Sequence, residues 1–303
     1  MTEQKIKNVT WISIIRPTAK DIQMLNDRFP ELHPLIAEDL AAPTIRPSHV
    51  EMHDHHLYMV LHFPNFLEDQ GKVISHEIDF ILIGDTLITV QYEDDRLLGS
   101  ICTECVSAKA INAEYGKTVV HLLYFILHKF FSFSLKELDQ IQERIDAIED
   151  DVFEGFEKEI LHDISVLKRN VLDFRRAVKP QQLTLESLAI QGSQLYGEKV
   201  KPLLTELVNE YLKVWNLLEN HKEALDALYE TNNALLVSKT NEIIRVFTVL
   251  AFITFIPTMI ANFYGMNIHL PYADNPLAFW IVTGLMLIVT ALVWYMLKWK
   301  KLV

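Results

Sequence analysis

A short uncharged segment carries the polar side chain that stands out most in this sequence. Residues 261–270, ANFYGMNIHL, contain Tyr264, Gly265, Met266 and Asn267 and lie between two long apolar runs. An asparagine amide donates and accepts hydrogen bonds without carrying a charge. The segment therefore raises the question of what a neutral amide does between two stretches that are apolar enough for a membrane.

A second set of candidate residues recurs along the apolar run that precedes this segment. Its members follow one another in steps of three and four residues, which places them on one stripe of a helix. They are Asn241, Ile244, Thr248, Ala251, Phe255, Thr258 and Asn262. Unpaired polar groups are costly against lipid, so the stripe fits either the lining of a narrow pore or contact between packed helices. The spacing alone leaves both interpretations open.

Cysteines and histidines give weaker signals of metal chemistry. Cys102 and Cys105 form a single CTEC without a second pair, a pattern that favours reduced thiols over a zinc or redox site. Neutral imidazoles suit Zn²⁺, and one stretch holds several of them: His49, His53, His55, His56 and His62. A strand over HHLYMVLHF would point His55 and His56 to opposite faces, which argues against a compact zinc site.

The composition excludes some classes of function. The chain has 40 acidic and 28 basic residues and a formal net charge of -12, which argues against a nucleic-acid partner. Acidic residues concentrate between Lys136 and Asp163, where we expect a solvated helix face and, secondarily, attraction of cations. No nucleophile–base set or phosphate-binding loop is present, so the sequence does not predict an enzyme.

Two apolar runs near the C-terminus are long enough to cross a membrane. Residues 246–273 and 276–297 contain no Asp, Glu, Lys or Arg. Each run exceeds the roughly 20 residues that a spanning helix needs. We expect span 1 at about residues 243–263, a loop at 264–276, span 2 at about 277–297 and a short basic tail. Lys and Arg flank the spans and are absent from the loop, which predicts that both termini are cytoplasmic.

The rest of the chain predicts a cytosolic α+β domain followed by a long helical stalk. In residues 1–118, EIDFILIGDTLITVQY reads as a hairpin turning at Gly84-Asp85, with HHLYMVLHF as another strand of the same sheet. Residues 119–240 predict a helical region and stalk, and residues 241–303 the membrane region. From Pro202 a helical pattern continues to Phe263 with an apolar seam. The seam comprises Leu204, Leu207, Tyr211, Val214, Leu218, His221, Leu225 and Leu228.

Four blocks of residues resemble the CorA family of divalent cation channels. Tyr264-Gly265-Met266-Asn267 between two C-terminal spans is similar to the family signature. HPLIAEDL at residues 33–40, followed by Arg46-Pro47 and Val50-Glu51, resembles its H-P-L-x-x-E-D segment. SKTNEI at residues 238–243 and PTMIANFYGMN at residues 257–267 resemble the entry and exit of its first span. The blocks occur in the family's order, so the resemblance extends over most of the chain.

The resemblance implies a funnel-shaped homopentamer in the cell membrane that conducts Mg²⁺ inward and, less readily, Co²⁺ or Ni²⁺. Asn267 maps onto the selectivity amide, Asn241 onto a ring at the cytoplasmic end of the pore, and Thr258 onto an inner polar ring. Phe247 and Phe255 fall where the family usually has Leu and Met constrictions, which leaves the resting pore width open.

The resemblance also implies feedback by cytosolic Mg²⁺ bound between neighbouring subunits. Asp39 matches one bridging acid, Glu206 falls where its partner lies, and Glu38 contributes as a further candidate ligand. A second acid that is frequent on an early helix of the family is His128 here, which weakens the case for a second sensing metal. The alternatives are a membrane-anchored divalent-cation sensor and a zinc-transporting relative, although that branch usually carries valine in place of Met266.

Overall fold

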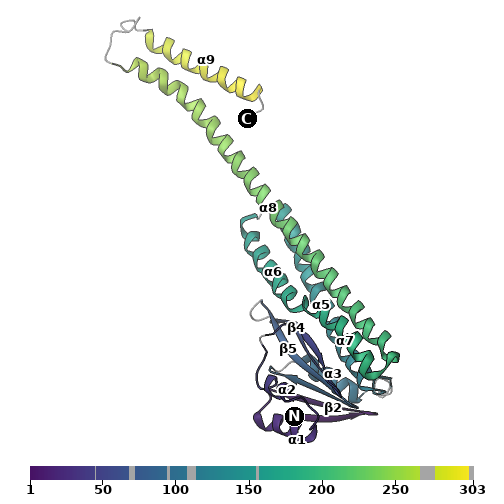
Figure 1. Cartoon of the computed structure of the whole chain (residues 1–303). Helices are drawn as coiled ribbons and strands as arrows, with labels where there is room; N and C mark the ends of the chain where they lie inside the picture. Colours follow the sequence, from purple (N-terminus) through teal and green to yellow (C-terminus); the bar gives the residue numbers. More distant parts are fainter. Residues whose placement is uncertain are drawn as a thin grey trace. The chain divides into compact units, whose positions relative to one another are not determined.

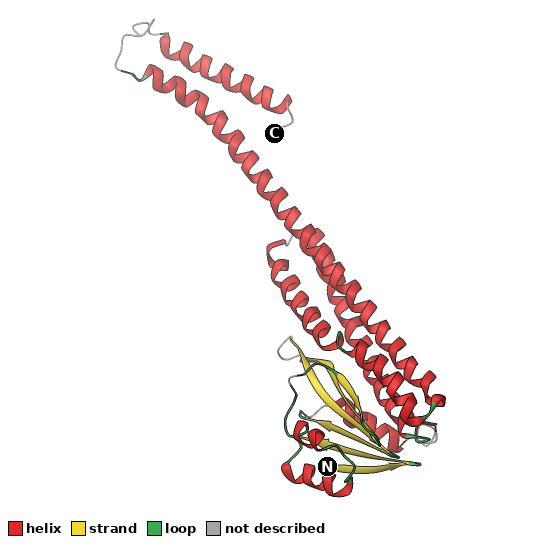
Figure 2. Ribbon diagram, viewed as in Figure 1, coloured by secondary structure: helices red, strands yellow, loops and turns green. Residues whose placement is uncertain are grey.

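The computed structural model describes residues 1–44, 46–67, 72–93, 96–107, 114–154, 157–266 and 277–299. The chain divides into two compact units, unit 1 at Met1–Tyr229 and unit 2 at Glu230–Val303. Figure 1 follows the chain through both units, and Figure 2 distinguishes their helices and strands. Each unit is described by itself below.

Unit 1 is built on one mixed β-sheet. Its strands are β1 (Thr2–Ile6), β2 (Val9–Ile15), β3 (His49–Met52), β4 (His56–Leu67), β5 (Lys72–Ile83) and β6 (Thr86–Gln91). They lie in the order β1-β2-β6-β5-β4-β3, and neighbours are antiparallel except for the parallel pair β2 and β6. The predicted hairpin joins β5 to β6, and its turn contains Gly84 at a φ of 53°, a left-handed conformation that glycine adopts without steric cost.

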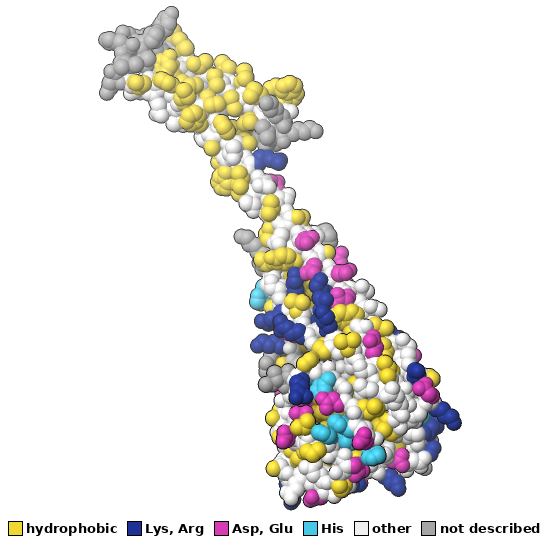
Figure 3. Space-filling model, viewed as in Figure 1, with side chains coloured by type: hydrophobic (Ala, Val, Ile, Leu, Met, Phe, Trp, Pro, Cys, Tyr) yellow, Lys and Arg dark blue, Asp and Glu magenta, His cyan; other side chains and the backbone are white. Residues whose placement is uncertain are grey.

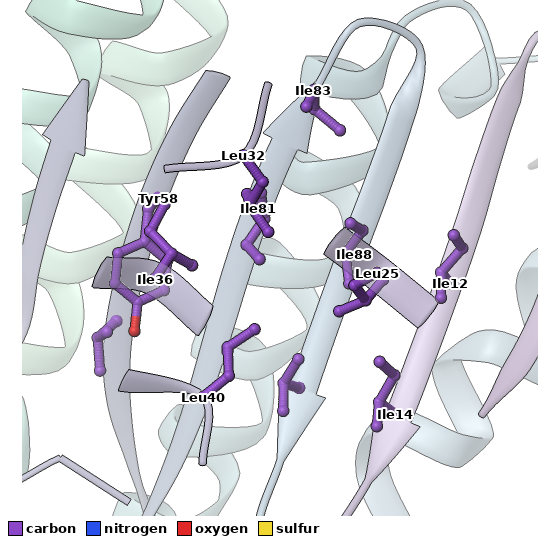
Figure 4. Close-up of a cluster of buried hydrophobic side chains, with 12 residues drawn as sticks. Ile12, Ile14, Leu25, Leu32, Ile36, Leu40, Tyr58, Ile81, Ile83 and Ile88 are labelled. Atoms are coloured by element: carbon purple, nitrogen blue, oxygen red, sulfur yellow. The ribbon is translucent and has the colours of Figure 1, made fainter. Parts of the chain in front are cut away.

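Two short helices cover one face of this sheet. The helix α1 (Ala19–Arg28) begins at a capping box formed by Thr18 and Asp21, and α2 (Pro34–Asp39) has a proline in its first turn. Their apolar side chains close a buried cluster with alternate residues of the strands (Figure 4). The cluster comprises Ile12, Ile14, Leu25, Leu32, Ile36, Leu40, Tyr58, Val60, Ile81, Ile83, Ile88 and Val90.

Longer helices pack on the sheet from its other side. They are α3 (Arg96–Ser107), α5 (Val119–Glu154), α6 (Glu157–Val178) and α7 (Gln181–Tyr196), and a 3-10 turn (Glu198–Val200) leads into α8. Phe63 of β4 stacks on Phe130 of α5 with ring centroids 4.3 Å apart. Because Phe63 and Tyr58 differ in parity along β4, they lie on opposite faces, and unit 1 therefore has three layers.

The predicted stalk is a single helix, α8 (Lys201–Tyr264). Every residue of the predicted seam is at most 9% exposed, which confirms that this face of α8 packs inside unit 1. The seam includes His221, which is 1% exposed and whose pKa is lowered mainly by burial. His221 is therefore a polar residue packed inside the seam.

Unit 2 contains the end of α8 and the helix α9 (Ala278–Trp299). Both are long and apolar enough to cross a membrane, and the mean hydropathy of the most apolar stretch of each is 2.1. No residue of these two stretches is buried. The same test also marks Val119–Val152 within α5, but more than half of that window is buried in the protein. The predicted fold class, an α+β domain followed by a long helix and terminal apolar helices, is therefore confirmed.

Candidate ion pathway and candidate regulatory site

The predicted pore stripe lies entirely on α8. Its residues, together with Phe247, are exposed on the single chain, including both aromatic candidates at 66% for Phe247 and 62% for Phe255. Figure 3 shows hydrophobic side chains gathering over this end of α8 and over α9, whereas charged side chains gather over unit 1. An apolar surface of this kind requires lipid or further protein to cover it.

The threonines of the stripe satisfy their hydroxyl groups within the helix. Thr248 Oγ1 donates to the carbonyl oxygen of Ile244 at 2.7 Å, and Thr258 Oγ1 donates to that of Thr254 at 2.7 Å. Such bonds lower the cost of a hydroxyl group in an apolar environment. Asn241 and Asn262 present larger amides with two donors and an acceptor each, and these are the stripe groups that gain most from water or a polar partner.

Pro257 interrupts the hydrogen bonding of α8 beside this stripe. A proline has no amide hydrogen, so the carbonyl of Ile253, one turn earlier, loses its usual helical donor. The helix nevertheless continues to Tyr264. Membrane helices tolerate such breaks where neighbouring groups or water satisfy the freed carbonyl.

The chain leaves α8 at the predicted signature. The amide of Gly265 donates to the carbonyl of Ala261 at 2.9 Å, and the amide of Met266 donates to that of Phe263 at 3.4 Å. A Cβ atom at position 265 would come within 3.3 Å of the Ala261 carbonyl oxygen, which explains a glycine at this point. Asn267 and the rest of the loop lie outside the described residues.

The candidate regulatory acids Glu38 and Asp39 occupy the end of α2. His33 caps the start of this helix, where its Nδ1 accepts a hydrogen bond from the Leu35 amide at 3.3 Å. Ile36 and Leu40 anchor the helix in the buried cluster, whereas Glu38 is exposed and Asp39 is half-buried. The fold thus holds the backbone of α2 firmly and leaves its acidic end accessible.

A buried carboxyl group that sequence reasoning missed lies near this end of α2. Asp79 on β5 is fully buried, and its Oδ2 accepts hydrogen bonds from the hydroxyls of Tyr92 at 2.9 Å and Tyr58 at 3.3 Å. Its Oδ1 has no hydrogen-bond partner among the residues that the structure describes. Burial, reinforced by the charge of Glu77, raises the pKa of Asp79 to about 8. The available signal was an aspartate in the middle of an apolar strand, EIDFILI.

The third candidate acid, Glu206, lies on α8. It is half-buried, and its Oε2 accepts a hydrogen bond from Asn209 Nδ2 at 2.9 Å. One turn later, Glu210 pairs with Lys213 at 3.1 Å and lies 3.7 Å from His128 Nδ1. In the described part of a single chain, no recorded ion pair or hydrogen bond joins Glu206 to Asp39 or Glu38. Their predicted contact, which concerns neighbouring subunits, stays a prediction.

The cysteines and histidines do not converge on a metal site. Among the described residues, no group of three or more His, Cys, Asp or Glu side chains could hold a metal ion. Cys102 and Cys105 are free thiols, and burial raises the pKa of Cys105 to about 12. His56 is buried, with a pKa lowered to about 4 by burial and then by His53, whereas His55 is exposed. His56 is the first residue of β4 and His55 precedes the strand, so the expected alternation of the two histidines across one strand stays a prediction.

An α+β domain is followed by one long helix with an apolar end and by a second apolar helix, and this arrangement defines an integral membrane protein with a large polar domain. The chain belongs to the family of CorA-like Mg²⁺ transporter proteins, whose family model matches residues 7–300. This is a family of membrane ion transporters and not of enzymes.

Individual relatives agree with this assignment along most of the chain. The cobalt/magnesium transport protein CorA of Thermotoga maritima is 24% identical over 293 residues, which cover 96% of this chain and 83% of that protein. The complete structure of the CorA magnesium transporter from Methanocaldococcus jannaschii has a TM-score of 0.83 at 20% identity, over 96% of this chain and 90% of that one. The ZntB cytoplasmic domain from Vibrio parahaemolyticus has a TM-score of 0.54 at 18% identity, over 78% and 88%.

Proposed function

We propose that this chain forms a homopentameric channel in the cell membrane that conducts Mg²⁺ inward, and also Co²⁺ or Ni²⁺. The observation that carries the proposal is the polar stripe of α8, which leads directly to the turn at Gly265 and Met266. The spans of one chain cannot enclose a hydrophilic path, so conduction needs a ring of subunits. In that ring, the stripe residues from Asn241 to Asn262 line the pore, with both termini on the cytoplasmic side.

Asn267 supplies the selectivity amide at the outer mouth of the proposed pore. Mg²⁺ gives up its water reluctantly, so a ring of neutral amides can bind the hydrated ion through its water shell without holding it too tightly. Carboxylates at the same place would bind the ion more strongly and slow its release. The sequence around Asn267 supports this assignment because residues 261–270 contain no acidic side chain, and the acid of the loop, Asp274, lies seven residues further along the chain.

The membrane potential is sufficient to drive this uptake. Moving one charge across 100 mV releases about 2.3 kcal/mol, so a divalent cation gains about 4.6 kcal/mol. This energy sustains a concentration ratio of roughly a thousandfold. Passive inward flux therefore accounts for uptake without coupling to nucleotide hydrolysis.

Cytosolic Mg²⁺ closes the proposed channel by binding between Asp39, with Glu38, of one subunit and Glu206 of its neighbour. Carboxylates that face each other repel when the site is empty, and a bound cation holds them together by attracting both. The accessible position of the acidic end of α2 supports this role. Mg²⁺ is thus both the transported ion and the regulator in this proposal.

Flux through purified protein in liposomes tests the conduction pathway. With an inside-negative potential and a Mg²⁺-sensitive dye inside, the native protein should load the vesicles and Asn267→Ala should not. The matched control is His269→Ala, which changes the same loop and should leave the flux intact. Normal flux through an assembled Asn267→Ala channel would exclude the amide from selectivity.

The same vesicles discriminate the alternative functions. A membrane-anchored sensor would bind Mg²⁺ without loading the vesicles, and a zinc transporter would load Zn²⁺ in preference to Mg²⁺. The structural likeness to a ZntB cytoplasmic domain concerns the fold alone and does not say which ion this chain transports. The Zn²⁺ flux therefore has to be measured beside the Mg²⁺ flux. For feedback, Asp39→Ala and Glu206→Ala should stay open at high internal Mg²⁺, while Asp85→Ala, an exposed acid in the β5–β6 turn, should close normally.

A further inference from the structure

Tyr92 connects the buried carboxyl group of Asp79 to the end of α2. Its hydroxyl lies 2.9 Å from Asp79 Oδ2 and 3.4 Å from the backbone carbonyl oxygen of Asp39. Tyr92 follows β6 directly, and Asp79 pairs with Val90 of that strand and with Val60 of β4. Val60 and Val90 belong to the cluster beneath α2, so Asp79 points to the same face of the sheet.

The Asp39 carbonyl needs such a partner because of its place in the helix. The last carbonyl groups of a helix have no amide donors within the helix and require capping from outside. The hydroxyl of Tyr92 reaches this carbonyl: its single hydrogen is shared between Asp79 Oδ2 at 2.9 Å and the Asp39 carbonyl oxygen at 3.4 Å, so the bond to Asp39 is the longer branch of a bifurcated hydrogen bond. This contact joins the backbone of Asp39, a candidate regulatory acid, to a side chain that follows the sheet strand β6.

Asp79 holds Tyr92 in place at an energetic cost. A fully buried carboxyl group with one unpartnered oxygen destabilises the fold, since burial of a polar atom without a hydrogen bond costs free energy. Its other oxygen accepts from both tyrosines and so fixes the hydroxyl of Tyr92 near α2. Tyr58, the second donor, has a recorded bond to Asp79 and none to α2, which makes it a matched control.

We propose that Tyr92, held by Asp79, is a positioning residue that fixes the end of α2 and thereby presents the Asp39 carboxylate to regulatory Mg²⁺. The inference rests on the proposed feedback role of Asp39. The proposed Mg²⁺ site depends on contact between subunits. The inference adds that, within each subunit, Tyr92 must hold the end of α2 in place. A loosened α2 would leave the carboxylate present and less often in the geometry that binds the ion.

The test compares Tyr92→Phe with Tyr58→Phe in the full-length protein in liposomes. Each variant removes one hydroxyl that donates to the same oxygen, and only Tyr92 also reaches Asp39. For Tyr92→Phe we expect the internal Mg²⁺ concentration that half-closes the channel to rise about 5-fold, the effect of one lost hydrogen bond. Flux at low internal Mg²⁺ should match the native protein, and Tyr58→Phe should shift half-closure less than 2-fold.

Thermal unfolding of both variants separates positioning from general damage to the fold. Equal loss of melting temperature in the two variants, together with a shift in half-closure confined to Tyr92→Phe, would support the inference. An unchanged half-closure in Tyr92→Phe, or equal shifts in both variants, would overturn it. Asp39→Ala separates the failure of this inference from the failure of the proposed feedback. If Asp39→Ala closes normally, the feedback role of Asp39 fails. If Asp39→Ala stays open while Tyr92→Phe closes like the native protein, only the role of Tyr92 fails.

Discussion

Replacing Asp79 with asparagine should remove a pH dependence from the stability of unit 1. In the folded protein the pKa of this carboxyl group is raised to about 8, whereas an exposed aspartate in the unfolded chain titrates near 3.8. Between these values the folded state holds a proton that the unfolded state has released. The contribution of the Asp79 proton to the free energy of unfolding is therefore fully present below about pH 4, and it is lost as the pH rises towards about 8.

The size of the effect follows from the single proton involved. One proton bound only in the folded state changes the free energy of unfolding by at most about 1.4 kcal/mol per pH unit. For a unit of this size, that corresponds to roughly 3–6 °C in melting temperature per pH unit. Asp79→Asn keeps an oxygen that can accept from Tyr58 and Tyr92 and has no charge to develop, so its profile should be flatter by this amount.

The assay is thermal unfolding of the full chain in detergent between about pH 5.5 and about pH 8.5. This range covers the upper part of the interval between the two pKa values. Asp85→Asn is the matched control because Asp85 is exposed at the turn between β5 and β6. The melting temperature of the native protein minus that of Asp79→Asn should fall steadily as the pH rises, because only the native protein develops a buried charge, and the same difference should stay constant for Asp85→Asn. Parallel profiles for the native protein and Asp79→Asn would refute the assignment of a raised pKa to this group.

Two further predictions concern the fold. Leu218→Ala empties a fully buried position of the α8 seam and should destabilise unit 1 by about 2–5 kcal/mol, measured as a loss of melting temperature. Gly84→Ala places a side chain on a residue at a φ of 53° and should cost about 1–2 kcal/mol, although no atom lies within 4 Å of the added carbon. Gly99→Ala, in open space on α3, is its control and should be neutral or stabilising by the same measurement; an equal loss in both would contradict the conformational explanation.

The parts of the fold that the sequence predicted are those with local periodicity. The seam of α8 repeats in steps of three and four, and the structure buries all of it, including the polar His221. The β5–β6 hairpin has apolar runs on both sides of Gly84-Asp85, and the strands pair as expected from Ile78 with Gln91 to Ile83 with Thr86. In each case the signal lies within a few neighbouring residues, so one sequence is enough to recognise it.

The Asp79 cluster shows why other features could not be predicted. Tyr58, Asp79 and Tyr92 lie on or beside three different strands, and only the register of those strands brings their oxygens together. No local pattern encodes that register for a polar group in an apolar strand. The candidate ion sites meet a further limit, since the pore and the contact of Asp39 with Glu206 are predicted between subunits, and Asn267 lies outside the described residues.

A similar ambiguity affects the apolar helices. By length and mean hydropathy, Val119–Val152 resembles a membrane span, and only its burial in unit 1 separates it from the end of α8 and α9. The sequence nevertheless pointed to the correct interpretation, because α5 carries an acidic second half after its apolar first half. Charge along the whole helix was therefore more informative than the most apolar window.

Pro257 gives the membrane part of α8 a mechanical property that a regular helix would lack. Its ring leaves the carbonyl of Ile253 without an amide donor and removes one of the bonds that resist bending, so stiffness along the helix has a minimum there. The segments before and after this point can tilt with respect to each other at lower energy than two neighbouring turns elsewhere. The end of the helix that carries Asn262 and Tyr264 can consequently adjust its direction while the residues around Asn241 keep theirs.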